Sequence, residues 1–212
     1  MGSKERKERE RREKQELILN TAAEIMKKDG IDNISIRKIA HRIEYSPAII
    51  YHYFRDKNEI IGHLMKRGYQ KILDGLASAQ NTTDDPQEKL RQMTRNYIEV
   101  SLQMSDEYKA VQLNSTPGVV AQTASLFKGA AAKKPALKIL FQGLKEIYRD
   151  RDIDDSVIEL TAQIIAASTF GLIIRLIMEQ DLISEEQKTN LIDHFIRITV
   201  DGMVLGNTLD RG

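Results

Sequence analysis

The sequence has no cysteine, no tryptophan and only 4 prolines among its 212 residues. Without cysteine, a disulfide, a thiolate zinc site, an iron–sulfur cluster and a cysteine nucleophile are all excluded. A signal peptide is not expected, because the charged start MGSKERKERERREKQE has no apolar region. The uncharged apolar stretch from Leu160 to Ile174 has 15 residues, fewer than a membrane span needs. We therefore expect a soluble, cytoplasmic protein that does not bind a membrane.

The overall charge is almost balanced, with 32 Lys and Arg against 31 Asp and Glu, but its distribution is uneven. Residues 1–72 contain 17 basic and 11 acidic residues, and residues 73–212 contain 15 and 20. A basic N-terminal third is typical of a part that binds a polyanion. An uneven distribution without any partner is the alternative, so charge alone does not decide the function.

The apolar residues follow helical spacing, and no run alternates in the manner of a strand. Ile18, Ala22, Ile25 and Met26 predict a long first helix from the basic start to about Lys28, followed by Gly30 in the left-handed conformation. We therefore predict an all-α protein of about nine helices. Residues 113–135, rich in Pro, Gly, Ser and Thr, predict short helices and loops.

Several helix starts can be read from their capping residues. Ser35 precedes a short helix, and Ser46-Pro47 is typical of the start of another. Capping boxes are predicted at 56–59, at 85–88 and at 184–187, where the last helix would begin and run to about Leu205. The second and third short helices, separated by a turn of about three residues, form the arrangement of a helix-turn-helix DNA-binding unit. A purely structural three-helix bundle is the alternative.

The segment from Ile34 to Ala40, Ile-Ser-Ile-Arg-Lys-Ile-Ala, is followed at fixed spacing by Ser46, Ile50-Tyr51, Phe54, Lys57 and Glu59-Ile60. In order and spacing this pattern resembles the N-terminal signature of the TetR (tetracycline-repressor) family, over roughly residues 14–62. The resemblance implies a helix-turn-helix domain at residues 1–60, with a basic N-terminal arm. It implies a helical ligand-sensing and dimerisation domain at residues 61–212.

The resemblance also assigns roles to single residues. It implies that Tyr51 and Lys57 bind DNA phosphates and that Ser35 contacts the backbone, and each side chain can donate to a phosphate oxygen. Lys57 would gain from a helix N-terminus, where free N–H groups favour an anion. The helix from Pro47 to Phe54 would enter the major groove, with Ile50 and Phe54 facing the core. The residues then presented to DNA are Pro47, Ala48, Ile49, His52 and Tyr53.

None of these five residues is Arg, Lys, Asn or Gln, the types that read bases with paired hydrogen bonds. We therefore expect this helix to contact thymine methyl groups and to use His52. Arg37 is the candidate for a guanine contact, with a phosphate contact or a solvated side chain as the alternative. The chain departs from the family at Glu44, where a Gly is usual; a positive φ there would cost about 1 kcal/mol.

The N-terminal arm from Lys4 to Lys14 contains seven Lys and Arg, interleaved with five Glu up to Glu16. Pairs four residues apart, such as Glu8 with Arg12, predict a salt-bridged solvent helix that extends the first helix. The other interpretation is that the surplus positive charge contacts phosphates or the minor groove. Both interpretations stay open for the arm.

The last two helices are apolar on more than one face, as Leu160, Ile164 and Ile174 show in one of them and Leu191 and Ile192 in the other. Such helices must be buried on two sides, and a second copy of the chain is the simplest partner. In proteins that this sequence resembles, C-terminal helix pairs form a four-helix dimer interface. A two-fold dimer would set two recognition helices about 34 Å apart, one turn of DNA.

The resemblance further implies a pocket for a small apolar or amphipathic effector between the middle helices. Candidate lining residues are the Met and aromatic side chains there, together with one charged residue in an apolar helix: Met93, Tyr97, Met104, Tyr108, Phe127, Phe141, Phe170 and Arg175. Most such apolar side chains are simply core. Arg175 would pair with an acidic ligand or with a carboxylate of the other subunit.

An enzyme is the main rival class. The sequence has no Gly-rich phosphate loop, no nucleophile elbow and no His pair at metal spacing, so we expect no catalytic residue, no metal and no cofactor. An all-helical protein-binding adaptor without DNA specificity is the second rival, but it leaves Tyr51, Phe54 and Lys57 unexplained. The function predicted is a DNA-binding transcriptional regulator, a ligand-responsive repressor that binds a two-fold operator in duplex DNA as a homodimer.

Overall fold

The computed structural model describes residues 2–78 and 83–204, and every regular element in these two ranges is a helix. The all-α prediction is therefore confirmed. The described ranges contain eleven α-helices, two more than predicted. The chain forms two compact units, one of residues 1–69 with 106–115 and the other of residues 70–105 with 116–212. The predicted functional division after residue 60 stays a prediction.

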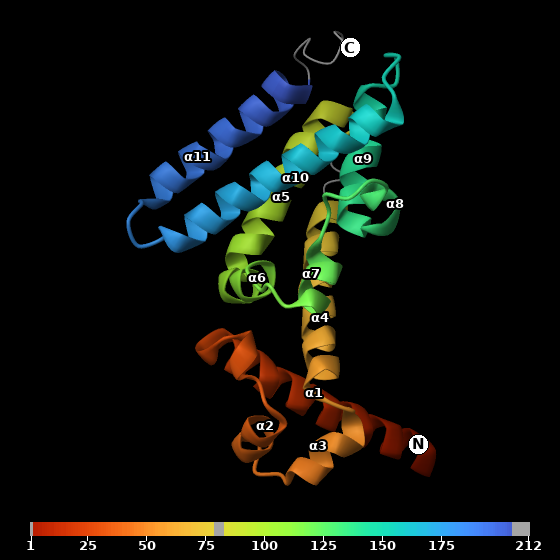
Figure 1. The fold of residues 1–212 in the computed structure, drawn as a ribbon, viewed down its shortest axis with the longest axis vertical. Coiled ribbons are helices and arrows are strands. Elements are labelled where there is room, and N and C mark those ends of the chain that lie inside the picture. The colour runs from red at the N-terminus through yellow and green to blue at the C-terminus, as the bar shows by residue number, and fades with distance from the viewer. Residues whose placement is uncertain (1, 79–82, 205–212) are drawn as a thin grey trace. The chain divides into compact units, whose positions relative to one another are not determined.

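The first unit contains α1 (Ser3–Asp29), a 3-10 turn at Ile31–Asn33, α2 (Ile36–Arg42), α3 (Pro47–Tyr53), the first part of α4 (Lys57–Ser78) and most of α6 (Ser105–Gln112). Figure 1 shows α2 and α3 following the long α1. The core between these helices is made of aliphatic side chains with one aromatic ring: Ile18, Leu19, Ala22, Ile25, Met26, Ile31, Ile34, Ile36, Ile39, Ala40, Ile50, Phe54, Ile60 and Leu64.

The end of α1 differs from its prediction. Gly30 has a positive φ of 87°, but its ψ of 159° is extended and not that of the left-handed helix. The Gly30 N–H still closes the helix on the Met26 carbonyl, at 3.0 Å. A side chain is disfavoured at this φ, so a glycine is needed here, although for a different backbone conformation than expected.

The second unit contains the rest of α4, α5 (Pro86–Gln103), α7 (Pro117–Thr123), α8 (Ala130–Lys133), α9 (Pro135–Ile147), α10 (Asp155–Met178) and α11 (Glu185–Arg197), which continues as a π-helical segment at Ile198–Val204. α5 packs against α9, α10 and α11. The short α7 and α8 confirm the prediction for residues 113–135 and account for helices beyond the number expected. The predicted end of the last helix, Leu205, lies outside the described residues.

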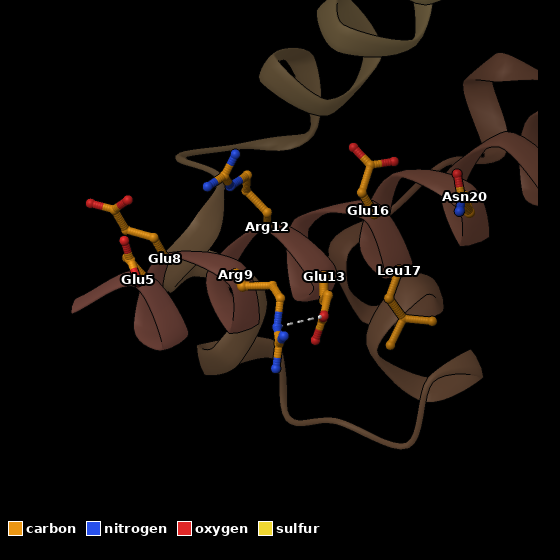
Figure 2. Close-up of a pocket in the computed structure, with 8 residues that line it drawn as sticks. All are labelled: Glu5, Glu8, Arg9, Arg12, Glu13, Glu16, Leu17 and Asn20. Carbon is orange, nitrogen blue, oxygen red and sulfur yellow. Dashed lines mark ion pairs between the residues drawn. The ribbon is translucent and has the colours of Figure 1, made fainter. Parts of the chain in front are cut away.

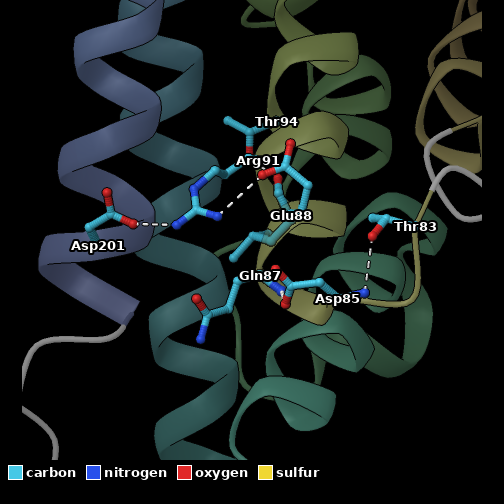
Figure 3. A network of polar contacts seen from close by, with 8 residues as sticks. Thr83, Asp85, Gln87, Glu88, Arg91, Thr94 and Asp201 are labelled. Carbon is cyan, nitrogen blue, oxygen red and sulfur yellow. Dashed lines mark hydrogen bonds and ion pairs between the residues drawn. The ribbon is translucent and has the colours of Figure 1, made fainter.

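The three predicted capping boxes form only in part. At 184–187 the Ser184 hydroxyl accepts the Gln187 N–H at 3.1 Å. At 85–88 the Asp85 carboxylate accepts the Gln87 N–H at 3.1 Å, but the Asp85 N–H donates to Thr83 Oγ1 at 3.2 Å instead of to Glu88. Glu88 pairs with Arg91, which also binds Asp201 at 2.6 Å (Figure 3). At 56–59 the Asp56 carboxylate accepts the Glu59 N–H at 2.9 Å. The Glu59 carboxylate in turn accepts the N–H of Arg55, one residue earlier than a standard box.

The contact of Arg91 with Asp201 is one of two ion pairs that hold the C-terminal helix to α5. Arg95, one turn further along α5, binds Asp193 of α11 at 2.6 Å. The hydrogen bond that Arg91 donates to the Asp201 carboxylate is the main cause that raises the pKa of Arg91. These two arginines are four residues apart and so lie on one face of α5, where they fix α11 and the π-helical segment in register along it.

α10 is long and apolar enough, by length and composition, to cross a membrane, and 39% of its apolar window is buried. A core helix of a soluble protein passes the same test. The buried side chains of α10, such as Ile165, Ile173 and Ile177, face the rest of the unit. Its other side carries exposed apolar residues, as the sequence predicts for a helix covered on two sides.

Candidate nucleic-acid interface

The interface begins at α2, whose first turn is fixed by its cap. The Ser35 hydroxyl accepts the Lys38 N–H at 3.2 Å, which confirms Ser35 as the cap residue. Ser35 is exposed, so its hydroxyl faces solvent as well. Its predicted contact with the DNA backbone stays a prediction.

The turn between α2 and α3 is closed by the Tyr45 N–H, which donates to the Ala40 carbonyl at 2.9 Å. Glu44 has a φ of 57°, the only positive φ of a non-glycine residue in the described ranges. The structure therefore adopts the conformation for which a glycine is usual, and Glu44 bears the steric cost of a Cβ there. The helix-turn-helix therefore forms although Glu44 stands where a glycine is usual.

The two faces of α3 are separated as predicted. Ile50 and Phe54 are buried in the core at 0% and 2% exposure. Pro47, Ala48 and Ile49 are exposed, and so is His52. The outward face therefore offers short apolar side chains and one imidazole, the groups that we expect to contact thymine methyl groups and one polar base edge.

Tyr53 is the exception among the residues predicted for this face. It is half-buried and packs against the core of the first unit, with its ring 5.3 Å from that of His52 in a T-shaped contact. Its ring therefore supports His52 from the side and is less available to DNA than the other residues of the face.

The cations of α2 have different surroundings. Lys38 binds Asp29 of α1 at 2.8 Å, and Arg42 lies 3.9 Å from the same carboxylate. These contacts hold the pKa of Asp29 below its ordinary value, chiefly through the hydrogen bond from Lys38. Arg37 is exposed and has no carboxylate partner in the described part of the chain. Of the Lys and Arg side chains of α2, Arg37 is thus the one with a charge free to contact DNA.

Tyr51 and Lys57 extend this surface beyond α3. The Tyr51 ring is 57% exposed although its neighbour Ile50 is fully buried. Lys57 is the first residue of α4 and is exposed. The Asp56 carboxylate already occupies the first turn of α4, and the Glu59 N–H is the main cause that lowers the pKa of Asp56. The sequence suggested that free N–H groups at the start of α4 help Lys57 to bind an anion. Because the Asp56 carboxylate already accepts from this turn, Lys57 offers only its side chain to a phosphate.

Two further residues of this surface were not assigned a DNA contact from the sequence. Ser46 stands at the cap position of α3, but its exposed hydroxyl makes no capping bond, so it remains available to an oxygen acceptor. Arg55, between α3 and α4, is 84% exposed and only loosely paired with Asp56 at 3.3 Å. The signal that could have identified them is their position at the two ends of the predicted recognition helix, Ser46 at its cap and Arg55 in the loop after it.

The residues predicted for an effector pocket belong to both units, and their role in one pocket stays a prediction. Met93 is buried, Tyr97, Phe141 and Phe170 are half-buried, and Met104 is buried, all in the second unit. Tyr108 belongs to the first unit.

Two pocket candidates lie at the surface. Phe127 is exposed, with the ammonium groups of Lys133 and Lys134 near its ring. Arg175 is 68% exposed and pairs with Glu179 on its own helix, so its charge is balanced without a buried ligand. The hollow drawn in Figure 2 is lined only by residues of α1 and contains none of the predicted pocket residues.

Comparison with known proteins agrees with this geometry. Residues 18–64 match the family model described as bacterial regulatory proteins of the tetR family. No curated protein matches the chain in sequence.

Solved structures similar to this chain include a TetR-family transcription regulator from Shewanella sp. PV-4, at a TM-score of 0.68 and 15% identity over 89% of this chain and 96% of the other. A proposed fatty acid metabolism regulator of Clostridium perfringens gives 0.65 and 22% over 88% and 97%. The fatty acid degradation regulator of Bacillus halodurans gives 0.62 and 17% over 89% and 95%.

These TM-scores show a shared fold over nearly the whole chain. The family model covers α2, α3 and the residues around them. The buried core of the first unit and the exposed face of α3 are those of a DNA-binding helix-turn-helix domain. In its N-terminal residues 18–64 the chain matches the tetR family model, and over nearly its whole length it shares the fold of solved TetR-family transcriptional regulators.

Proposed function

We propose that this protein is a ligand-responsive repressor that binds a two-fold operator in duplex DNA as a homodimer, in the cytoplasm. The observation that supports DNA binding most directly is the composition of one surface. Arg37, Ser46, Tyr51 and Lys57 are exposed there with polar groups that can reach phosphates or base edges. The apolar side chains of Ile39, Ile50 and Phe54 between them are buried in the core.

The roles within this surface follow from the side chains. Tyr51, Lys57 and Ser35 contact phosphates and set the register of the protein on the duplex. Ala48, Ile49 and His52 face the bases of the major groove, and Arg37 reads a guanine beside them. Since apolar contacts prefer thymine methyl groups, we expect half-sites with T-rich positions opposite α3 and a guanine at one edge.

The dimer is proposed from the exposed side of α10. Leu160, Ile164 and Met178 are 60%, 53% and 61% exposed, and they recur at spacings that place them on one stripe of the helix. Ala167 and Gly171 lie on the same stripe and are exposed too, so a second helix can approach closely. Leu191 and Ile198 give the C-terminal helix a similar exposed edge. A second copy of the chain covers these residues by the same two-fold symmetry that the operator requires.

The effector is proposed as a small apolar or amphipathic molecule held by the second unit. Its action follows from linkage: a molecule that prefers a dimer with wrongly spaced recognition helices lowers operator affinity by its differential affinity for the two states. Two of the similar structures are described as regulators of fatty acid metabolism and degradation. Fatty acids are therefore the first compounds to test.

The experiment that tests the proposed function is selection of binding sites from random duplex DNA by the purified full chain, at two salt concentrations. We expect enrichment of a two-fold symmetric site whose half-sites are one helical turn apart, and a steep loss of affinity with salt. No enriched site from a folded dimer would overturn DNA recognition and favour a protein-binding adaptor instead. Release of the selected duplex by a fatty acid would support the effector, and unchanged affinity with every compound would count against it.

A further inference from the structure

The first half of α1 extends past the core as an exposed helix. Residues 4–14 are all exposed, and burial begins only after Leu17, which is itself 42% exposed. A helical segment of this length spans about 15 Å. It therefore carries a surface of its own, continuous with the DNA-binding unit.

The charges of this segment are sorted by face. Lys4, Lys7, Arg11 and Lys14 follow one another at spacings of three and four residues, so they lie along one side of the helix. We call these four residues the cationic stripe. In the described part of the chain none of the four pairs with a carboxylate, whereas Arg6 binds Glu10 at 3.2 Å and Arg9 binds Glu13 at 3.5 Å.

The other side of the same segment is acidic. Figure 2 shows the carboxylates of Glu5, Glu8, Glu13 and Glu16 there, with Arg9 and Arg12 between them. Glu16 on this side also binds Arg67 of α4 at 2.5 Å. On this side the four carboxylates outnumber the two cations, so the surplus positive charge of the segment lies on the cationic stripe.

The direction of the cationic stripe is set by the core. Continuing the same spacing of three and four residues along α1 leads from Lys14 to Ile18, Ala22 and Ile25, which are all fully buried against the helix-turn-helix. The stripe thus lies on the same side of α1 as the residues that pack against α2 and α3. Because residues 4–14 extend beyond the core, this side of the segment is exposed to solvent. Asp29, close to the same line, binds Lys38 of α2, which fixes this orientation.

We propose that the cationic stripe binds phosphates of the duplex that flank each half-site, so that the N-terminal arm lengthens the DNA footprint. This inference rests on the proposed DNA-binding function and names a further contact surface for it. The four unpaired cations point toward the side of the recognition helix, and a row of phosphates is the polyanion that this side would meet. The acidic side faces away and keeps the arm from wrapping around the duplex.

The test uses two double variants that change the net charge equally on opposite sides of one helix. K7Q/R11Q removes two cations of the stripe, and R9Q/R12Q removes two cations of the acidic side. Gln keeps nearly the helix propensity of Lys and Arg, and circular dichroism checks that both variants keep the wild-type helix content. Affinity for the selected duplex is measured at several salt concentrations between 50 and 200 mM, with long flanks and with flanks trimmed to the half-sites.

We expect K7Q/R11Q to flatten the salt dependence on the long duplex by about two units of slope, since each phosphate contact adds about 0.9. Its loss of affinity across this salt range would then be about tenfold smaller than that of the wild type. R9Q/R12Q should keep the wild-type slope. Trimming the flanks should flatten the slope of the wild type further than K7Q/R11Q does on the long duplex, because it removes the phosphate partners of all four cations, and it should abolish the difference between the wild type and K7Q/R11Q. Equal slopes for the two variants would overturn the proposal, because net charge alone would explain the result. If the wild-type chain binds no duplex, the proposed function itself fails, and the stripe with it.

Discussion

Glu159 and Gln163 lie one turn apart on α10, and both bind the backbone of the segment that leads into α8. The Glu159 carboxylate accepts the N–H groups of Gly129 and Ala131, at 3.0 and 2.9 Å. The Gln163 amide donates to the carbonyls of Ser125 and Phe127, at 2.9 and 3.0 Å. Two side chains of one helix thus hold a stretch whose own helices are too short to be stable alone.

The contact of Glu159 makes the stability of this stretch depend on pH. The N–H groups of Ala131 and Gly129 lower the pKa of Glu159 from its ordinary value of 4.5. A carboxyl whose pKa is lowered by folding stabilises the fold above its unfolded pKa, and this contribution is lost as the pH falls through the folded pKa. We expect Glu159→Gln to be less stable than the wild type at pH 7, with the difference shrinking below about pH 4.5.

Denaturant unfolding at pH 7, 5 and 3.5 measures this difference. Glu146→Gln is the matched control, because Glu146 is an exposed residue of α9 whose carboxylate makes no hydrogen bond within the described ranges. Its difference from the wild type should not change with pH. A constant difference for Glu159→Gln as well would show that its carboxylate does not hold the segment.

Glu44 in the turn of the helix-turn-helix should be replaceable by glycine with a gain. Its φ of 57° is unfavourable for a residue with a Cβ and costs nothing for glycine. We expect Glu44→Gly to raise the free energy of unfolding by about 1 kcal/mol, measured by urea denaturation. Glu44→Ala removes the same charge and keeps the Cβ, so it should give no such gain. An equal gain from both variants would assign the effect to charge instead of backbone strain.

The DNA surface separates residues that bind phosphates from those that read bases. We expect Tyr51→Phe and Lys57→Ala to weaken binding about equally on all duplexes, and Lys57→Ala to reduce the salt slope by about one unit. Arg37→Ala or His52→Ala should change the preferred sequence, at about 1–3 kcal/mol for the position that is read.

Repeated site selection with each variant, followed by titration on matched and mismatched duplexes, checks this division. Lys27→Ala is a suitable control, because Lys27 is exposed in the last turn of α1 and lies outside the predicted surface. Wild-type affinity and preference in all four variants would remove this surface from the DNA interface.

The exposed stripe of α10 predicts the effect of a charge on assembly. Ile164 is 53% exposed in the middle of the stripe, so Ile164→Glu would place a carboxylate where two copies meet. We expect this variant to be monomeric in sedimentation measurements and to lose at least tenfold in operator affinity, since each half-site is then bound alone. Leu182→Glu changes an 84% exposed residue beyond α10 and should leave the dimer intact. A dimeric Ile164→Glu would exclude this face as the interface.

The sequence by itself determined the all-helical fold and the helix-turn-helix, because both depend on local spacing. Ile18, Ala22 and Ile25 mark a helix face wherever they pack, and the segment from Ile34 to Lys57 contains its caps, turn and buried positions within one short stretch. The burial of Ile50 and Phe54 and the positive φ of Glu44 could therefore be anticipated.

Only the tertiary structure decided which charged side chains are paired with a carboxylate and which are not. Arg37 differs from Lys38 and Arg42 because Asp29, at the end of another helix, lies beside the latter two. Asp201 and Asp193 meet Arg91 and Arg95 across about a hundred residues, and no local pattern announces such pairs. The sequence gives the charge and polarity of each residue. Which residue it pairs with depends on packing, because ion pairs and pockets join segments that only the folded chain brings together.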